Sequence, residues 1–345
     1  ARNTEMSRDI LRNAEIPAKI HGPHNPFEQV IANPISLRRP VTLHHVNADK
    51  VPEQVLSAPP SIHIGFLLWE LERLPQSHLL AGKMLDEIWT PSRYVQKIYQ
   101  IAFNREVIDV GKSISLPDVA AAELREYDIG DSLYVFLLGF DAHSSVERKN
   151  PLAAVRAFQL AFAQQQNVRL IVKTTPVGPS HWGDPNRQMP KIHALAGLDP
   201  RVIEDNRMLP FPDFLALIKR ADCVVSSHRA EGFGYIPAYA LRFGRPVIAT
   251  DYSGTTDFCT SETAFPVRHK LEAARADETI VPVNGAKWAD VNVTDLAENM
   301  LEVFNSRTEA LARAKNGQEL IRTRYSPEAQ TARYLDRFRA LGVID

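Results

Sequence analysis

A short stretch that combines an acid with glycines, Glu231-Gly-Phe-Gly234, stands between an apolar run and a helix-forming segment. Its two glycines can adopt a positive φ and let the backbone approach a ligand closely. Pro237 suits the first turn of the helix that follows, where free backbone N–H groups and the helix dipole favour an anion. Glu231 adds an acceptor for hydroxyl groups. A phosphate bound beside a polyol is the chemistry of a nucleotide sugar, so the stretch predicts a nucleotide-sugar site.

The segments on either side of this stretch predict the elements that position it. The apolar run 221–226 predicts a buried strand, and the run 246–249 predicts the next one. Gly244 suits the position just past the end of the intervening helix, where a left-handed residue is common. The order strand, loop, helix, turn and strand follows from these signals.

The stretch resembles the signature of the retaining glycosyltransferases of family 4, which have the GT-B fold. That signature is an acid, Gly-Phe-Gly, a second acid eight positions after the first, and a Gly-x-Pro-Val-Ile-Ala strand. The matching residues are Glu231, Gly232, Phe233, Gly234, Gly244, Pro246, Val247, Ile248 and Ala249. The second acid is absent, because position 239 is a tyrosine. An ordinary strand-loop-helix unit of a Rossmann-like domain remains the alternative interpretation.

The resemblance implies an α/β fold of the GT-B class, with two Rossmann-like domains whose parallel sheets face a central cleft. Strands alternate with helices along the chain, which indicates parallel sheets. We expect an acceptor-side domain over residues 1–120, a nucleotide-sugar-binding domain over 121–325, and a last helix over 326–345 that crosses back to the first domain. The first strand and glycine-rich loop of the family are expected to be missing, because the first predicted element is a helix.

The composition is typical of a soluble globular protein, with 345 residues, 44% hydrophobic and 23% charged. The formal net charge of −1 gives no electrostatic reason to expect nucleic acid as a partner. No apolar run has the length of a transmembrane helix, and no secretory signal opens the chain. Cys223 and Cys259 are expected as buried thiols, which fits a reducing cytoplasm. Peripheral association with the inner face of the membrane is left open.

The resemblance places the donor site in the C-terminal half. Glu231 and Lys149 are the expected catalytic residues: Glu231 binds donor-sugar hydroxyls, and Lys149, beside a helix N-terminus, binds the diphosphate. A surface charge is the alternative for Lys149. The usual arginine after the preceding strand is absent, since Gly139 is followed by Phe140. The other expected donor-binding residues are Arg148, Gly232, Phe233, Gly234, Tyr235, Tyr239, Lys173, Gly254 and Thr255, and the segment 206–211 stands where the family holds the nucleobase.

Polar residues follow two predicted strands of the N-terminal half, at 41–46 and 61–68. Ligands of α/β sheets bind beyond the carboxyl ends of strands, and a Trp-Glu-Leu segment like the one after residue 68 faces the acceptor in a subgroup of the family. The expected acceptor-side residues are His45, Asn47, Trp69 and Glu70. Two alternatives stay open: His44 and His45 alternate across a strand with one buried, and Glu70 is a solvated acid.

Loops and a helix cap are also predicted from local signals. Segment 141–148 and the long polar segment 174–190 are expected to be loops. Asn150 is expected to cap a helix that has Pro151 in its first turn. Leu152, Val155, Phe158 and Phe162 would then line the buried face of that helix.

The resemblance implies a chemistry without metal or cofactor. The chain has no Asp-x-Asp pair, the metal-clamp signature of GT-A transferases. A GT-B enzyme stabilises the leaving nucleoside diphosphate with cationic side chains and backbone N–H groups. Retaining transfer is written as front-face attack, in which the donor phosphate accepts the proton of the acceptor, so we assign no nucleophile. The expected function is transfer of a hexose from a nucleoside-diphosphate sugar to a saccharide or lipid-linked acceptor, in polysaccharide or glycoconjugate biosynthesis.

Tyr239 weakens the usual ribose clamp, because a tyrosine is uncharged and makes one hydrogen bond at a time to a diol. Three interpretations compete: another mode of ribose binding, which we favour; an unusual donor; or an inactive nucleotide-sugar-binding or partner module. We expect the Tyr239 side chain to face the cleft. A nicotinamide or flavin enzyme is disfavoured, because Gly232-Phe-Gly234 lacks a third glycine at the required spacing.

Overall fold

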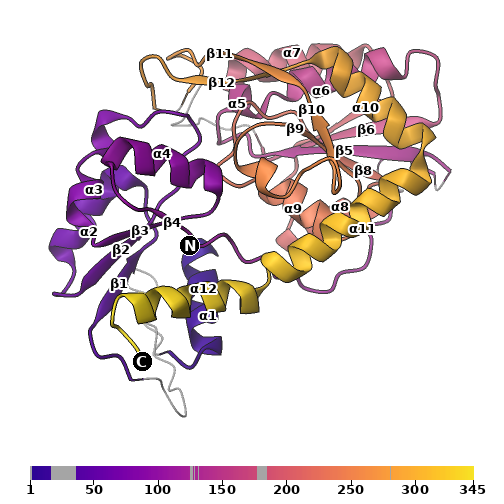
Figure 1. Ribbon diagram of the computed structural model, residues 1–345. Coiled ribbons are helices and arrows are strands. Elements are labelled where there is room, and N and C mark those ends of the chain that lie inside the picture. The colour runs from indigo at the N-terminus through magenta and orange to yellow at the C-terminus, as the bar shows by residue number, and fades with distance from the viewer. Residues whose placement is uncertain are drawn as a thin grey trace. The chain divides into compact units, whose positions relative to one another are not determined.

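The computed structural model describes residues 2–16, 36–124, 127, 129–130, 132–176, 185–279 and 281–345. The chain divides into two compact units, each built on its own parallel sheet (Figure 1). Unit 1 comprises Ala1–Trp69, Leu74–Ser115 and Thr323–Asp345, and unit 2 comprises Glu70–Arg73 and Leu116–Arg322. None of the described helices combines the length and the apolarity that crossing a bilayer requires.

Unit 1 is a four-stranded parallel sheet with the strand order β1-β2-β3-β4 and flanking helices. The strands are β1 (Val41–His44), β2 (Ile62–Phe66), β3 (Glu87–Thr90) and β4 (Ile108–Asp109). The helices are α1 (Arg2–Asn13), α2 (Val51–Ser57), α3 (Ala81–Met84), α4 (Arg93–Phe103) and α12 (Pro327–Ala340), with short 3₁₀ turns η1 (Ala48–Lys50) and η2 (Gln76–His78). Ser92 caps α4, since its Oγ accepts a hydrogen bond from Val95 N.

The C-terminal helix α12 belongs to unit 1. Its Tyr334 ring lies 4.5 Å from the Trp89 ring of β3, and Tyr334 Oη lies 2.9 Å from Ser7 Oγ of α1. Arg337 of α12 also donates a hydrogen bond to the carboxylate of Glu87, with an Nε–Oε1 distance of 3.1 Å. The first and last helices therefore pack together although they lie at opposite ends of the sequence.

Unit 2 is a six-stranded parallel sheet with the order β10-β9-β8-β5-β6-β7, plus an antiparallel hairpin. The sheet strands are β5 (Tyr134–Phe140), β6 (Val168–Thr174), β7 (Val202–Asp205), β8 (Cys223–Ser226), β9 (Val247–Thr250) and β10 (Phe265–Val267). The helices are α5 (Val146–Lys149), α6 (Pro151–Ala161), α7 (Pro185–Gly197), α8 (Phe211–Arg220), α9 (Tyr235–Arg242), α10 (Val293–Asn305) and α11 (Arg307–Arg324), with a 3₁₀ turn η4 (Ser253–Asp257). The hairpin pairs β11 (His269–Ala273) with β12 (Lys287–Val291).

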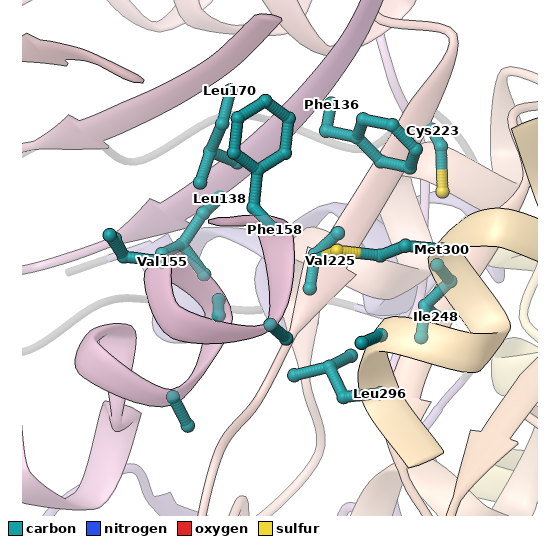
Figure 2. Close-up of a cluster of buried hydrophobic side chains, with 14 of the residues drawn as sticks. Phe136, Leu138, Val155, Phe158, Leu170, Cys223, Val225, Ile248, Leu296 and Met300 are labelled. Atoms are coloured by element: carbon teal, nitrogen blue, oxygen red, sulfur yellow. The ribbon is translucent and has the colours of Figure 1, made fainter. Parts of the chain in front are cut away.

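The core of unit 2 lies between the sheet and the pair α6 and α10. Figure 2 shows apolar side chains of both helices and of the sheet strands in one buried cluster, which includes Phe136 and Leu138 of strand β5. Val155, Phe158 and Phe162 are fully buried, which confirms the predicted apolar face of the helix after Pro151. Burial of each such side chain stabilises the fold by about 1.5–3 kcal/mol, so this core holds the strand ends that carry the site.

Three local predictions need correction. Residues 146–149 form the short helix α5, because Ser145 Oγ caps it by accepting from Arg148 N. Asn150 does not cap α6 with its side chain: it has a φ of 51° because it also ends α5, a position where a left-handed residue is common. Residues 185–190 belong to α7 and not to a loop. The sequence also predicts a turn and strand over residues 16–20 and a loop over 21–40, and of these segments residues 17–35 lie outside the described residues.

Candidate active site

Three loops of unit 2 build the candidate site at one edge of its sheet. The turn that contains α5 follows β5, the loop Glu231–Gly234 follows β8, and η4 follows β9. Strands β5, β8 and β9 are neighbours in a parallel sheet, so their carboxyl ends meet at the same edge. This is the edge at which α/β sheets bind ligands.

Two cations converge on the carboxylate of Glu231. Lys149 Nζ donates a hydrogen bond to Glu231 Oε1, and Arg148 Nη1 lies 3.5 Å from the same oxygen. Burial alone would raise the pKa of Glu231, but the positive charges of Lys149 and Arg148 outweigh it and lower that pKa to about 2. Glu231 is therefore ionised at neutral pH.

Arg148 is held in place by neighbours on several sides. Its Nη1 donates to Ala230 O at 2.8 Å, and its Nη2 donates to Ser144 Oγ at 2.6 Å. Nη2 also lies 3.7 Å from the carboxylate of Glu70, which belongs to unit 2. Burial by itself would lower the pKa of Arg148, but Glu70 and Glu231 raise it, so the guanidinium stays charged. The neighbouring side chains thus fix a positive group beside Lys149.

Two hydrogen bonds hold the glycine loop against η4. Glu231 N donates to Ser253 Oγ at 2.8 Å, and Gly254 N donates to Glu231 O at 2.9 Å. A Cβ on Gly254 would lie 2.4 Å from Gly232 O, so only glycine fits there. Gly234 has a φ of 97° and caps α9, as expected for a glycine that joins a loop to a helix.

His228 is a site-forming residue that the sequence analysis missed. Its Nε2 lies 3.2 Å from both Tyr252 O and Thr255 Oγ1, and its Nδ1 lies 2.9 Å from Ser226 Oγ. A carbonyl only accepts, so Nε2 carries the hydrogen and Nδ1 accepts from Ser226. Burial lowers the pKa of His228 to about 4, which keeps the ring neutral. Its position two residues after the buried strand β8, at the edge where ligands bind, was the signal that could have identified it.

A cavity of about 230 Å³ lies in unit 2 beside the first turn of α9. It is lined by Phe140, Asp141, Lys173, Thr174, Thr175, Arg207, Met208, Leu209, Phe211, Phe214 and Ile236. Most of the lining is apolar, with polar groups at the ends of β5 and β6. Part of the segment 206–211, predicted to hold the nucleobase, borders this cavity, and base binding itself stays a prediction.

Lys173 lines the cavity, but its ammonium is engaged by the backbone. Nζ donates to Thr174 O at 2.9 Å, to Asp205 O at 3.3 Å and to Arg207 O. The Asp205 carboxylate lies 3.6 Å away. Lys173 thus ties β6 to the segment after β7, and its expected contact with the donor stays a prediction.

The aromatic residues of the glycine loop and α9 are packed together. Tyr239 is 5% exposed, and its ring meets Phe211 edge-on at 5.9 Å and lies 5.7 Å from Tyr235. Phe233 is buried 5.2 Å from Phe258. The side chain of Tyr239 is therefore enclosed by neighbouring rings, not open to solvent. Phe211 lines the cavity, and contact of Tyr239 with the donor ribose stays a prediction.

The expected acceptor-side residues are divided between the units. His45, Asn47 and Trp69 belong to unit 1, and Glu70 belongs to unit 2 beside Arg148. Trp69 is buried edge-on against His78 at 4.6 Å, and Asn47 is exposed. In the described part of the chain, no group of three or more His, Cys, Asp or Glu side chains is arranged to hold a metal ion.

Comparisons with solved structures identify the fold. HepE from Anabaena, in complex with UDP-glucose, is 13% identical with a TM-score of 0.65, covering 87% of this chain and 78% of its own. Sucrose-phosphate synthase from Thermosynechococcus elongatus is 16% identical with a TM-score of 0.62, covering 88% of this chain and 73% of its own. TarM from S. aureus is 12% identical with a TM-score of 0.63, over 86% of this chain. The predicted α/β GT-B fold with two parallel sheets is confirmed.

The match to TarM covers 55% of that protein, so the chain spans little more than half of its length. No curated protein matches the sequence. Residues 109–334, more than half of the chain, match GT4-conflict, described as "Family 4 Glycosyltransferase in conflict systems". The protein therefore belongs to this family of glycosyltransferases.

Proposed function

We propose that this protein is a retaining transferase that moves a hexose from a nucleoside-diphosphate sugar bound in unit 2. The observation that carries the proposal is the convergence of Lys149 and Arg148 on Glu231, beside the glycine loop that opens α9. Two fixed cations and a helix N-terminus suit a diphosphate. The ionised carboxylate between them suits the hydroxyls of the attached sugar.

The proposed reaction uses charge stabilisation and no protein nucleophile. The bond from the anomeric carbon to the diphosphate oxygen breaks, and the acceptor oxygen bonds to the same face of that carbon. The departing oxygen takes the proton of the acceptor hydroxyl. Lys149 and Arg148 stabilise the charge that develops on the diphosphate, and their fixed positions avoid reorganisation during the step. Glu231 orients the sugar ring.

The nucleobase is proposed to occupy the cavity at Phe140, Phe211 and Ile236, whose apolar walls suit a flat ring. The acceptor is proposed to be a saccharide or lipid-linked molecule on the side of residues 1–120, in polysaccharide or glycoconjugate biosynthesis. The solved structure of TarM holds fondaparinux, alpha-GlcNAc-glycerol and UDP, which supports a carbohydrate-type acceptor. HepE was solved with UDP-glucose, which supports a nucleotide-sugar donor.

A hydrolysis panel tests the proposal. UDP-, GDP- and ADP-linked glucose, galactose, mannose and N-acetylglucosamine are each incubated with the protein, and released nucleotide is measured. We expect slow hydrolysis of at least one donor, and a fall of at least about tenfold in Glu231→Gln, because a neutral amide oxygen accepts weaker hydrogen bonds from Lys149 and from the sugar hydroxyls than a carboxylate does. Glu53→Gln is the matched control, since Glu53 is exposed on α2. Equal hydrolysis by Glu231→Gln and Glu53→Gln would contradict the assignment.

A further inference from the structure

Lys112 is a buried lysine of unit 1 for which no described residue supplies a counter-ion. It is 2% exposed, and its ammonium lies 3.9 Å from the centroid of the Phe66 ring. Across the described residues the structure shows no hydrogen bond or ion pair for this ammonium. Burial lowers the pKa of Lys112 to about 7. Buried charges in proteins are normally paired, so we expect a ligand or a partner to compensate the charge of this ammonium.

His45 lies beside the same phenyl ring and is also incompletely paired. The His45 and Phe66 rings stack with centroids 5.0 Å apart and an interplanar angle of 27°. Its Nε2 is buried and has no hydrogen-bond partner within the part of the chain that the structure describes. Burial, followed by the nearby charge of Lys112, lowers the pKa of His45 to about 3. A buried ring nitrogen without a partner is costly, and native structures contain few.

The three residues come from one edge of the unit 1 sheet. His45 directly follows β1, Phe66 is the last residue of β2, and Lys112 follows β4 in the chain. The carboxyl ends of these parallel strands share an edge, and that edge is where ligands of α/β sheets bind. The unpaired groups therefore gather at the place where the fold presents substrates.

We propose that Lys112 and His45 form a subsite for an anionic oxygen group, a phosphate or carboxylate, carried by the acceptor substrate. The proposal rests on the proposed function, because it names the chemical class of the second substrate. An anionic oxygen accepts hydrogen bonds from the ammonium and from a protonated Nε2 of neutral His45. The negative charge of such a group also compensates the positive charge of the Lys112 ammonium. A neutral hydroxyl group would leave that positive charge uncompensated. The phosphates of the donor offer the same chemistry, so the test separates the two sources.

Inorganic phosphate is the probe, and thermal melting of the full chain at about pH 6, where the ammonium is charged, is the measurement. Sodium chloride at equal ionic strength is the reference. The variants are Lys112→Met, which keeps the apolar stem, and Lys97→Met, which makes the same change at an exposed position of unit 1. We expect phosphate to raise the melting temperature of the wild type and of Lys97→Met by the same amount. In Lys112→Met we expect this increase in melting temperature to be smaller by at least about half. An equal rise in Lys112→Met and Lys97→Met overturns the subsite.

A second variant, His45→Phe, tests the subsite independently in case Lys112→Met folds poorly. His45→Phe keeps a ring on Phe66 and removes Nε2, and we expect a weaker phosphate response here also. A response equal to that of the wild type overturns the part assigned to His45. We expect Lys112→Met to fold, because replacing an unpaired buried charge with an apolar side chain of similar length removes a desolvation cost.

Calorimetry with UDP identifies the source of the anion. We expect UDP to bind Lys112→Met within about twofold of the wild type, because the donor diphosphate is assigned to unit 2. A loss of about tenfold or more in UDP affinity would assign Lys112 to the donor and overturn the acceptor subsite. Lys149→Met is the separate test of the donor site. If this variant binds UDP with wild-type affinity, the proposed donor site is wrong. The comparison of Lys112→Met with Lys97→Met still decides whether the phosphate subsite exists.

Discussion

Lys149 and Glu231 form a hydrogen-bonded ion pair in unit 2, although 82 positions separate them in the chain. Lys149 ends α5, and Glu231 begins the glycine loop. The pair forms because the strands that precede them, β5 and β8, are neighbours in register, with Leu137 opposite Val224. The carboxylate that we propose to orient the sugar and the cation that we propose to hold the diphosphate are thus positioned against each other.

Lys149→Met tests the donor diphosphate site. We expect UDP affinity to fall by about 1.5–3 kcal/mol, the usual contribution of a hydrogen bond to a charged group. The fold should tolerate the change, because Arg148 still lies 3.5 Å from Glu231. Titration calorimetry with UDP and GDP gives the measurement, and Lys97→Met is the control for charge. Unchanged affinity for every nucleoside diphosphate would remove Lys149 from the site.

Gly254→Ala tests the clamp between η4 and the glycine loop. The added Cβ would lie 2.4 Å from Gly232 O and 2.9 Å from Glu231 O, and both atoms are backbone, so the loop must move. We expect donor hydrolysis to fall by at least about tenfold, because a misplacement of about 1 Å at a site is costly. Gly130→Ala is the matched control, since nothing lies within 4 Å of its Cβ position. Equal activity of the two variants would show that the clamp is dispensable.

The stability of the protein should fall as the pH drops from 6.5 toward 4. Burial lowers the pKa of His44, His78 and His228 to about 4 from the ordinary 6.5. The unfolded chain therefore binds more protons than the folded one between these values, so the stabilisation is complete above pH 6.5 and is lost as the pH falls through the folded pKa. Glu231, with a pKa of about 2, adds a loss only below its unfolded value of 4.5.

Denaturant unfolding at a series of pH values measures this dependence. His228→Gln keeps a donor and an acceptor in the side chain but does not titrate. We expect its unfolding free energy to change less steeply with pH between 6.5 and 4 than that of the wild type. Identical slopes would mean that His228 is not buried in its neutral form.

Tyr239→Glu distinguishes two roles for the tyrosine on α9. The ring is 5% exposed and packs against Phe211, so a carboxylate at this position would be buried among aromatic rings. We expect a destabilisation of several kcal/mol, on the order of 3 kcal/mol, and near-normal stability for Tyr239→Phe. Melting curves with and without UDP and GDP give the measurement. A stable Tyr239→Glu variant that gains nucleotide affinity would instead support ribose contact at this position.

The local elements could be predicted from the sequence because their signals are local. The strand that ends at residue 226, Gly244 after α9 and the apolar face of α6 depend on residue spacing and backbone preference within a few positions. The family also followed from one contiguous stretch, residues 231–249, which keeps its order in the chain.

The tertiary structure decided what depends on strand neighbours and on burial. Only the order β9-β8-β5 brings Lys149, Glu231 and Gly254 together, since these residues are far apart in sequence. His228 gained its role from contacts with Tyr252 and Thr255 across two strands, and Tyr239 became enclosed because α8 supplies Phe211. The spacing of side chains along one segment does not tell which distant segment will pack beside it. The groups on that neighbouring segment determine the charge state, the tautomer and the exposure of each side chain.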